Sequence, residues 1–248
     1  MHKKLTPQMI EDITTEYYSR FCTINISQLK AGNYFICSEE RDKKLKGLGC
    51  KYSFYIFIKD DICIVSYSPK HKVFVEMIDK FDRDEIISLS KKNYNLKQRI
   101  LMIFDKEIIK NYGNAVVLKD NDYPFYKAFF KKAYPKANTK DWLYDYYLKK
   151  TNEEYFTGYF RDNELLSVCD APDMPYMENE IQHTGIKTLK KERRKGYASC
   201  TAALAAHNLI EKGVCPQWDC KAENIASFEL AKSIGYKEYA VAYILEEW

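Results

Sequence analysis

The 248-residue sequence predicts an α/β protein with two domains. Two kinds of segment indicate this class. Short runs in which β-branched or aromatic residues alternate with others predict strands, and longer amphipathic or Ala-rich runs predict helices. The clearest case is the alternating segment 181–188, which a basic turn at 190–195 joins to an Ala-rich helix opening at Gly196.

Composition narrows the class of protein. Hydrophobic residues make up 46% and charged residues 30% of the chain, as in ordinary globular proteins. The net charge of +4, with lysines spread along the chain, does not by itself indicate nucleic acid. With no apolar run of spanning length and no leader, we expect a cytoplasmic protein whose eight cysteines are reduced thiols. The histidines are scattered and no C-x-x-C occurs, so we expect no metal.

The N-terminal part, residues 1–112, predicts a small α/β domain of unknown role. Thr6-Pro7 is an N-cap and first-turn pair that opens a helix through about Arg20. Residues 52–59 and 62–68 alternate as two strands of a hairpin, and a helix follows Asp82. Residues 100–104 predict one more strand, and no catalytic pattern occurs in this part.

Residues 113–248 predict strands and helices in a regular order. Thr139 is the expected N-cap of a second helix, and the long helix that starts at Gly196 should end at Gly213. A closing pair of short strands is expected at the C-terminal end. The predicted strands are 114–118, 155–160, 164–169, 181–188, 215–220, 236–239 and 241–245, and the predicted helices are 123–133, 140–149, 196–212 and 224–234.

The turn before the Ala-rich helix has the features of an anion site. The first amides of a helix lack intrahelical partners, and the helix dipole places partial positive charge there. Gly196 lets the backbone approach a bound group closely, while Arg193, Arg194 and Lys195 add full charges. The turn therefore predicts a cradle for a phosphate or pyrophosphate.

The pattern Arg193-x-x-Gly196-x-Ala198 resembles the acetyl-CoA-binding motif of the GNAT (GCN5-related N-acetyltransferase) superfamily. Downstream, residues 214–220 resemble the family's fifth strand. The N-x-x-S-x-x-L run from Asn224, followed by Gly235-Tyr236, resembles its last helix. The resemblance covers residues 113–248, and the two-domain layout resembles a bacterial subgroup that carries an extra N-terminal α/β domain. It implies a mixed, mostly antiparallel seven-stranded sheet, flanked by helices and splayed between strands 4 and 5.

The resemblance also implies where acetyl-CoA, the co-substrate, would bind. Backbone groups of residues 186–188 would pair with the pantetheine arm, and amides of residues 194–199 would hold the pyrophosphate. Two alternatives stay open: Ser199 is equally a first-turn helix residue, and Asn224, for which we favour a ligand role, can also act as an N-cap. The candidate cofactor-binding residues are Ile186, Lys187, Thr188, Arg193, Arg194, Lys195, Gly196, Tyr197, Ala198, Ser199, Asn224 and Ser227.

The catalytic groups are less evident. The position of the family's usual tyrosine acid is Ala231, so Tyr236, Tyr239 or Tyr243 would have to substitute, unless these tyrosines only pack. Relatives carry a glutamate base on the fourth strand. Gln182 aligns with that site, and Glu180, two residues earlier on the same strand face, is the candidate catalytic base. On a regular strand, His183 would point to the opposite face.

The resemblance implies an acetyl-CoA-dependent N-acetyltransferase that acts on a primary amine of a small molecule or peptide, directly in a ternary complex. The alternative is a catalytically degenerate acyl-CoA-binding regulatory protein, which the missing tyrosine and glutamate favour. Binding of nucleic acid through the short cluster 190–195 is the weakest hypothesis. We expect no nucleic-acid or membrane partner. The N-terminal domain would shape the acceptor groove, cover it, or mediate homodimerisation.

Overall fold

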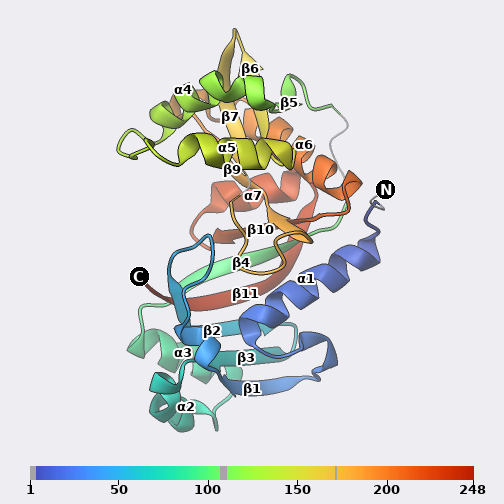
Figure 1. Ribbon diagram of the computed structural model, residues 1–248. Coiled ribbons are helices and arrows are strands. Elements are labelled where there is room, and N and C mark those ends of the chain that lie inside the picture. Colours follow the sequence, from blue (N-terminus) through green and yellow to red (C-terminus); the bar gives the residue numbers. More distant parts are fainter. Residues whose placement is uncertain (1–3, 107–110, 171) are drawn as a thin grey trace.

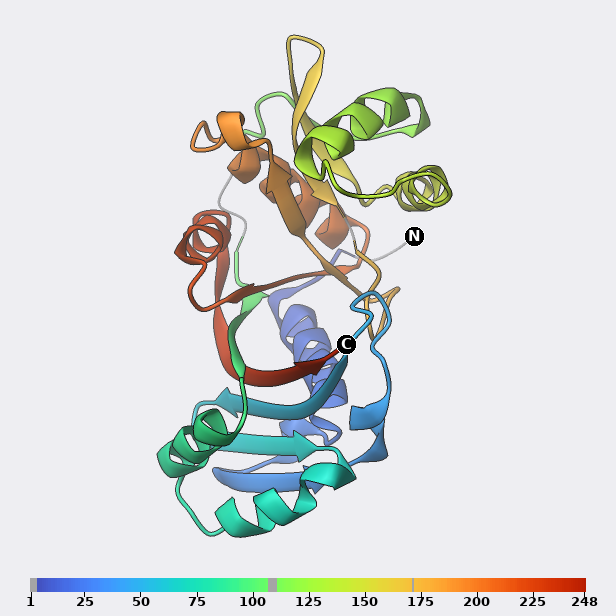
Figure 2. The same cartoon turned by 90° about the vertical axis from the view of Figure 1, so that its left-hand side faces the viewer.

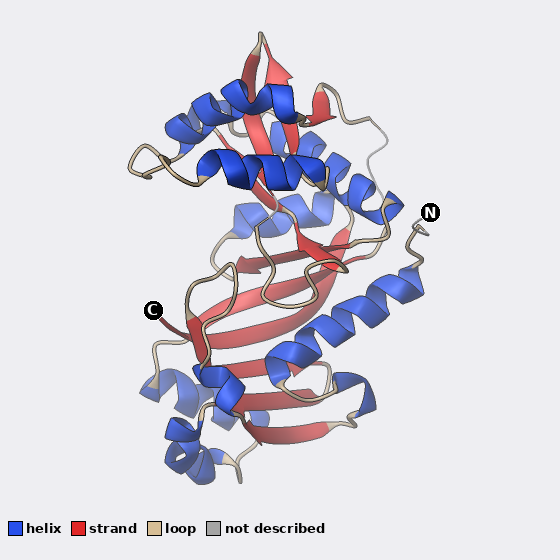
Figure 3. Ribbon diagram, in the orientation of Figure 1, coloured by secondary structure: helices blue, strands red, loops and turns tan. Residues whose placement is uncertain are grey.

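The computed structural model describes residues 4–106, 111–170 and 172–248, which form two β-sheets with helices packed on them (Figures 1 and 3). His2, one of the scattered histidines, lies outside the described residues. In spatial order the larger sheet contains β1 (Gly32–Cys37), β3 (Ile62–Tyr67), β2 (Lys51–Lys59), β11 (Tyr236–Glu247), β4 (Lys97–Phe104), β10 (Cys215–Lys221) and β8 (Ile181–His183). The smaller sheet contains β5 (Ala115–Val117), β6 (Thr157–Arg161), β7 (Glu164–Asp170) and β9 (Gly185–Thr188).

Helices cover both sheets. Figure 2 shows α1 (Pro7–Cys22) on one face of the larger sheet and the pair α2 (Lys72–Ile78) and α3 (Arg83–Asn93) on the other. A separate aromatic core joins the smaller sheet to α4 (Tyr123–Ala133) and α5 (Leu143–Asn152). The remaining helices, α6 (Tyr197–Glu211) and α7 (Ile225–Ser233), lie before and after β10 in the chain. The predicted α/β class, with a mixed seven-stranded sheet flanked by helices, is confirmed.

The larger sheet draws strands from both predicted domains. Strand β4, from the N-terminal part, lies between β10 and β11 and pairs antiparallel with each of them. Strand β11 in turn pairs with β2. Hydrogen bonds of one continuous sheet therefore join the ranges 1–112 and 113–248, and the boundary near residue 112 stays a prediction.

Several local predictions are confirmed by the backbone. The hydroxyl of Thr6 accepts a hydrogen bond from the amide of Met9 and caps α1. Asp82 caps α3 and forms a reciprocal capping box with Glu85. The hairpin of β6 and β7 turns at residues 162–163, both with positive φ.

Two local predictions are wrong. Helix α5 begins at Leu143, not at Lys140 after a Thr139 cap. Asn138 instead accepts the amide of Lys140 and, through its carbonyl, the indole N–H of Trp142, so this segment forms a turn. The predicted closing pair of strands is the single strand β11, whose register against β4 shifts at Tyr239. Such a shift adds one unpaired residue without ending the strand.

Candidate active site

The predicted strand 181–188 divides between the two sheets. Its first part, β8, pairs parallel with β10, and its second part, β9, pairs antiparallel with β7. The change occurs at Thr184, whose amide and hydroxyl both donate to the carbonyl of Gln217, at 3.0 and 3.1 Å. Beyond this point β10 follows the larger sheet and β9 the smaller one (Figure 1). The two sheets therefore separate at Thr184, which gives the splay between strands 4 and 5 that the family resemblance implied.

The turn before α6 is open and unoccupied by side chains. Gly196 is the N-cap of α6 with φ +85°, and no side chain caps the helix. A Cβ at Gly196 would meet no other atom within 4 Å. Arg194 also has positive φ, and the four residues 193–196 are exposed. The first amides of α6 and the free space above Gly196 fit an anionic group such as a pyrophosphate.

Side-chain contacts of Glu192, Lys195 and Tyr197 hold the turn in place. The ring of Tyr197 stacks on Tyr159 at 4.5 Å between centroids, and its hydroxyl accepts from Arg161 at 2.6 Å. Glu192 forms ion pairs with Lys195 and Arg161. Ala198 and Ser199 are half-buried in the first turn of α6. The packing and ion pairs fix the turn, while Arg193, whose Nε donates to the carbonyl of Thr188 at 3.4 Å, and Arg194 are exposed.

Strand β9 is an edge strand of the smaller sheet within the described residues. Its side chains are engaged: Ile186 packs on the main core, and the ammonium of Lys187 lies 4.8 Å from the ring centre of Tyr134. The hydroxyl of Thr188 bonds Ser167 at 2.7 Å. The side of the β9 backbone away from β7 pairs with no further strand of that sheet, as an extended ligand arm requires.

Asn224 and Ser227 act as structural residues at the start of α7. The side-chain oxygen of Asn224 accepts the amide of Ser227, which is the N-cap geometry left open by the sequence. The hydroxyl of Ser227 accepts the indole N–H of Trp218 at 3.2 Å. Contact of either residue with a ligand stays a prediction.

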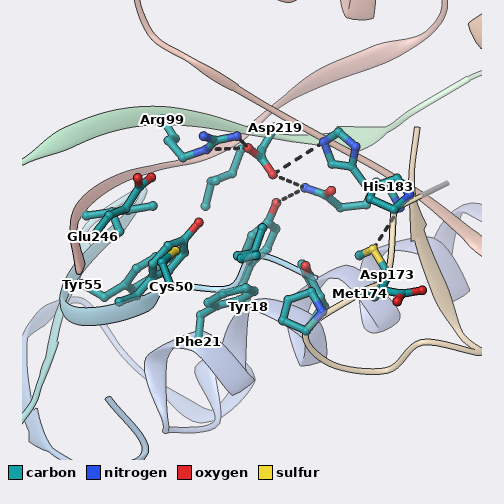
Figure 4. A pocket seen from close by; sticks show the side chains of 18 of the residues that line it. Tyr18, Phe21, Cys50, Tyr55, Arg99, Asp173, Met174, His183, Asp219 and Glu246 are labelled. Carbon is teal, nitrogen blue, oxygen red and sulfur yellow. Dashed lines mark hydrogen bonds and ion pairs between the residues drawn. The ribbon is translucent and has the colours of Figure 1, made fainter. Parts of the chain in front are cut away.

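A cavity of about 260 Å³ adjoins the parting of the sheets (Figure 4). The aromatic wall of this cavity comes from α1 and β2, the polar wall comes from β4, β8 and β10, and the loop 172–175 closes it. The aromatic wall comprises Tyr17, Tyr18, Phe21, Tyr52 and Tyr55, and the polar wall comprises Arg99, His183, Gln217 and Asp219. The N-terminal part thus supplies the aromatic wall and about half of the lining, a contribution that the sequence left open.

The polar wall is one connected network. Nε and Nη2 of Arg99 both donate to Oδ1 of Asp219. Oδ2 of Asp219 accepts from Gln217 at 3.3 Å and lies 3.8 Å from Nε2 of His183 (Figure 4). The Gln217 amide also donates to the hydroxyl of Tyr18 at 2.8 Å. Asp219 is therefore already paired, so its charge is not free to attract a cationic amine.

His183 is neutral at physiological pH. Burial, followed by the positive charge of Arg99, lowers its pKa to about 4. Its Nδ1 is buried and makes no hydrogen bond with a described residue. The sequence placed His183 on the face opposite the candidate base. In the structure the His183 side chain lines the cavity, because β8 ends at His183, next to Thr184, where the two sheets separate.

The sequence predicted that Glu180 lies on the strand with Gln182. In the structure it lies outside the strand, because β8 begins at Ile181. It is exposed in the turn that precedes β8 and is not part of the cavity lining. Its amide donates to the carbonyl of Met177, which ends the turn before strand pairing begins. Gln182 is buried, and its amide donates to the carbonyl of Pro172 at 2.8 Å. The role of Glu180 as a base stays a prediction without structural support at this position.

The tyrosines that could replace the family's acid are all engaged. The hydroxyl of Tyr236 bonds Thr184 at the parting, and that of Tyr239 bonds Thr15 of α1. Tyr243 packs in the core under α2 and α3. Ala231, at the usual tyrosine position, is buried in α7. Only Tyr236 lies at the parting itself.

Comparisons with known proteins agree with this geometry. The sequence model of the family described as GNAT acetyltransferase matches residues 24–244. The chain belongs to this family. YdfB of Bacillus subtilis, described as an uncharacterized N-acetyltransferase, is 28% identical over 138 residues. The match spans 52% of this chain and 48%, about half, of that relative.

Solved structures of the same superfamily show a distant likeness. A GNAT acetyltransferase from Colwellia psychrerythraea is 14% identical with a TM-score of 0.49, over 60% of this chain and 56% of that one. A GCN5-related N-acetyltransferase from Sphaerobacter thermophilus is 11% identical with a TM-score of 0.49, over 66% and 56%. At this distance neither adds to the family assignment.

No group of three or more His, Cys, Asp or Glu side chains in the described ranges could hold a metal ion. None of the helices in the described part of the chain combines the length and apolar character that crossing a membrane requires.

Proposed function

We propose that this protein transfers the acetyl group of acetyl-CoA directly to a primary amine in a ternary complex. One observation carries the proposal: the strand 181–188 parts at Thr184, with the open Gly196 turn at the end of β9 and the cavity at the end of β8. Acetyl-CoA and an amine bound at these two places would meet at the parting. Membership of the GNAT acetyltransferase family supports the same reaction.

Acetyl-CoA would supply an activated acyl group, and the chain would hold it at three places. The amides of residues 194–199 would bind the pyrophosphate, with the charges of Arg193 and Lys195 beside it. The free edge of β9 at residues 186–188 would pair with the pantetheine arm. Asn224 and Ser227, at the start of α7, would lie beside the thioester end.

His183 is the base that the geometry favours over Glu180. It would take the proton that the amine loses while the new C–N bond forms and the thioester C–S bond breaks. Its lowered pKa keeps the imidazole neutral, and its side chain is part of the cavity lining. Glu180, exposed in a turn outside the cavity, lacks this access.

The proposal also includes the cellular compartment and the partners of the protein. All eight cysteines are free thiols, which supports a reducing compartment, and we place the protein in the cytoplasm. A small-molecule amine is the proposed partner, and homodimerisation stays a prediction.

The second candidate is a binding protein without catalysis. Ala231 at the position of the usual tyrosine favours it. Under this hypothesis acetyl-CoA binds and no acceptor is turned over, so binding and turnover must be measured separately.

Isothermal titration with acetyl-CoA tests the cradle. We expect micromolar binding, on the order of −8 kcal/mol, that is lost in Gly196→Glu because the side chain and charge fill the space above the turn. Gly49→Glu is the matched control, since Gly49 also has positive φ, +70°, and open space around its Cβ position. Absence of binding in the wild type would refute the proposal.

A thiol-release assay over a panel of amines tests the reaction. His183→Gln should lower kcat by roughly 100-fold or more while acetyl-CoA binding is unchanged. Glu180→Gln should retain wild-type turnover. Loss of turnover in Glu180→Gln and not in His183→Gln would restore Glu180 as the base, and no turnover of any amine would favour the binding protein.

A further inference from the structure

We propose that the acceptor is a compact primary amine built on an aromatic ring that carries a hydrogen-bonding substituent. This inference rests on the proposed acetyl transfer and names the substrate class of the cavity. It is drawn from the shape and lining of the cavity, which belongs in part to the N-terminal half of the chain.

The aromatic wall offers flat surfaces to a ring. Phe21 stacks on Tyr55 with centroids 5.6 Å apart and planes 22° apart, and Tyr52 lies nearly parallel to Tyr55 at 7°. Leu101 and Ile244 add apolar surface nearby. Contacts between aromatic rings are favourable beyond the burial of apolar area, so an aromatic guest is favoured over an aliphatic chain.

The same wall carries hydroxyl groups without partners. The hydroxyls of Tyr17, Tyr52 and Tyr55 make no hydrogen bond with another described residue, although all three side chains are largely buried. None of the three is among the buried atoms that lack a partner, so each hydroxyl keeps contact with the cavity or solvent. A hydroxyl on the acceptor ring could bond to them.

The polar wall suits the amine. His183 and Gln217 are register partners on β8 and β10, so their side chains lie next to each other. Nδ1 of His183 and Oε1 of Gln217 are both buried without a hydrogen-bond partner. Nε2 of His183, 3.8 Å from Oδ2 of Asp219, and the carboxamide of Gln217 belong to the polar end of the lining, where a primary amine can form hydrogen bonds. The polar end of the lining would therefore place the reactive nitrogen next to Thr184, where the two sheets separate.

Charge and size exclude two other classes of amine. Each carboxylate of the lining already has a basic partner: Asp219 pairs with Arg99, Glu246 with Lys97, and Asp173 with Lys149 and Lys150. No unpaired side-chain carboxylate remains in the described lining for the second ammonium of a linear polyamine. The volume of about 260 Å³ lies below the range of roughly 300–1,000 Å³ typical of drug-sized ligands, which favours a compact molecule over a peptide.

The test compares tyramine, phenethylamine, spermidine and a lysine-containing tripeptide in the thiol-release assay. We expect kcat/KM for tyramine to exceed that for spermidine and for the tripeptide at least tenfold, with phenethylamine between them. Preference for spermidine or the tripeptide would overturn the aromatic class and leave acetyl transfer standing. If no amine is turned over, the proposed function fails, and titration calorimetry with tyramine alone then decides whether the cavity binds an aromatic amine.

Variants of the wall connect the preference to the cavity. Phe21→Leu and Tyr55→Leu should raise KM for tyramine about tenfold with kcat little changed, since they remove ring surface and keep apolar volume. Phe74→Leu, in the core on the opposite face of the sheet, is the control for general loss of packing. Circular dichroism establishes that each variant is folded. An unchanged KM in both folded wall variants would overturn the proposal.

Discussion

Arg99 and Asp219 join two neighbouring strands, β4 and β10, that lie 120 residues apart in the chain. Two guanidinium nitrogens donate to one carboxylate oxygen, and both side chains are about one-fifth exposed. Arg99 belongs to residues 1–112 and Asp219 to residues 113–248. The pair therefore closes the polar wall and at the same time ties the two halves of the sheet together.

Breaking this pair should affect both stability and His183. Arg99→Met leaves the Asp219 carboxylate without its cation, and we expect a loss of roughly 2–3 kcal/mol in the free energy of unfolding, measured with urea. Because Arg99 is one cause of the lowered His183 pKa, that pKa should rise in the variant, as measured by NMR titration. Arg99→Lys keeps the charge and should shift the His183 pKa less. An unchanged pKa in Arg99→Met would contradict the assigned cause.

His183 should make stability depend on pH. Its pKa is about 4 in the folded protein and about 6.5 when unfolded, so the unfolded chain binds the proton first as pH falls. The free energy of unfolding should therefore drop by about 2 kcal/mol between pH 6.5 and 4. In His183→Gln this part of the pH dependence should vanish, which the difference between the two unfolding curves isolates. Parallel curves over this range would show that the imidazole is not buried neutral.

Asp170, at the end of β7, should act with the opposite sign. Burial raises the pKa of Asp170 to about 6, and the positive charge of Lys187 opposes this rise. The charge of Asp170 in turn raises the pKa values of three nearby tyrosines, Tyr126, Tyr134 and Tyr146. The folded state holds this proton more tightly, so its contribution to stability is lost as pH rises from about 4 to 6.

Asp170→Asn removes this loss. Relative to wild type, the variant should gain about 1–2 kcal/mol in the free energy of unfolding between pH 4 and pH 7, as measured by urea denaturation at each pH. Asp162→Asn, in the exposed turn between β6 and β7, is the matched control and should show no such gain. The prediction fails if Asp170→Asn is destabilised more at pH 7 than at pH 4.

Gly47 connects the N-terminal half to the loop that closes the cavity. A Cβ at this position would lie 1.9 Å from the carbonyl oxygen of Asp173, and Gly47 has φ +73°. Gly49, two residues on, has φ +70° with no atom within 4 Å of its Cβ position. Gly47→Ala and Gly49→Ala thus carry the same backbone strain and differ in the contact with the loop.

We expect Gly49→Ala to cost about 1 kcal/mol and Gly47→Ala at least twice that, measured by urea denaturation. If the two variants lose equal stability, the close approach of Gly47 to Asp173 is not a feature of the folded protein.

Much of the fold could be predicted from short-range sequence patterns. The Thr6 and Asp82 caps, the alternation in β2 and β3, and the Gly196 turn depend on residues within a few positions of one another. The start of α5 was predicted too early because the Asn138 side chain accepts the Lys140 amide and holds this segment as a turn. The closing pair of strands was wrong because β11 continues through the register shift at Tyr239.

The sequence by itself determined the family motif, most of the helices and strands of residues 113–248, and the open turn at the start of α6. The tertiary structure decided that β4 enters the sheet between β10 and β11, and that His183 rather than Glu180 lines the cavity. The physical reason is range: capping, alternation and turn chemistry act between neighbours in the chain. Strand pairing and the side-chain contacts of the cavity join Arg99 to Asp219 and Tyr18 to Gln217 across 120 and 199 residues, and no local pattern records them.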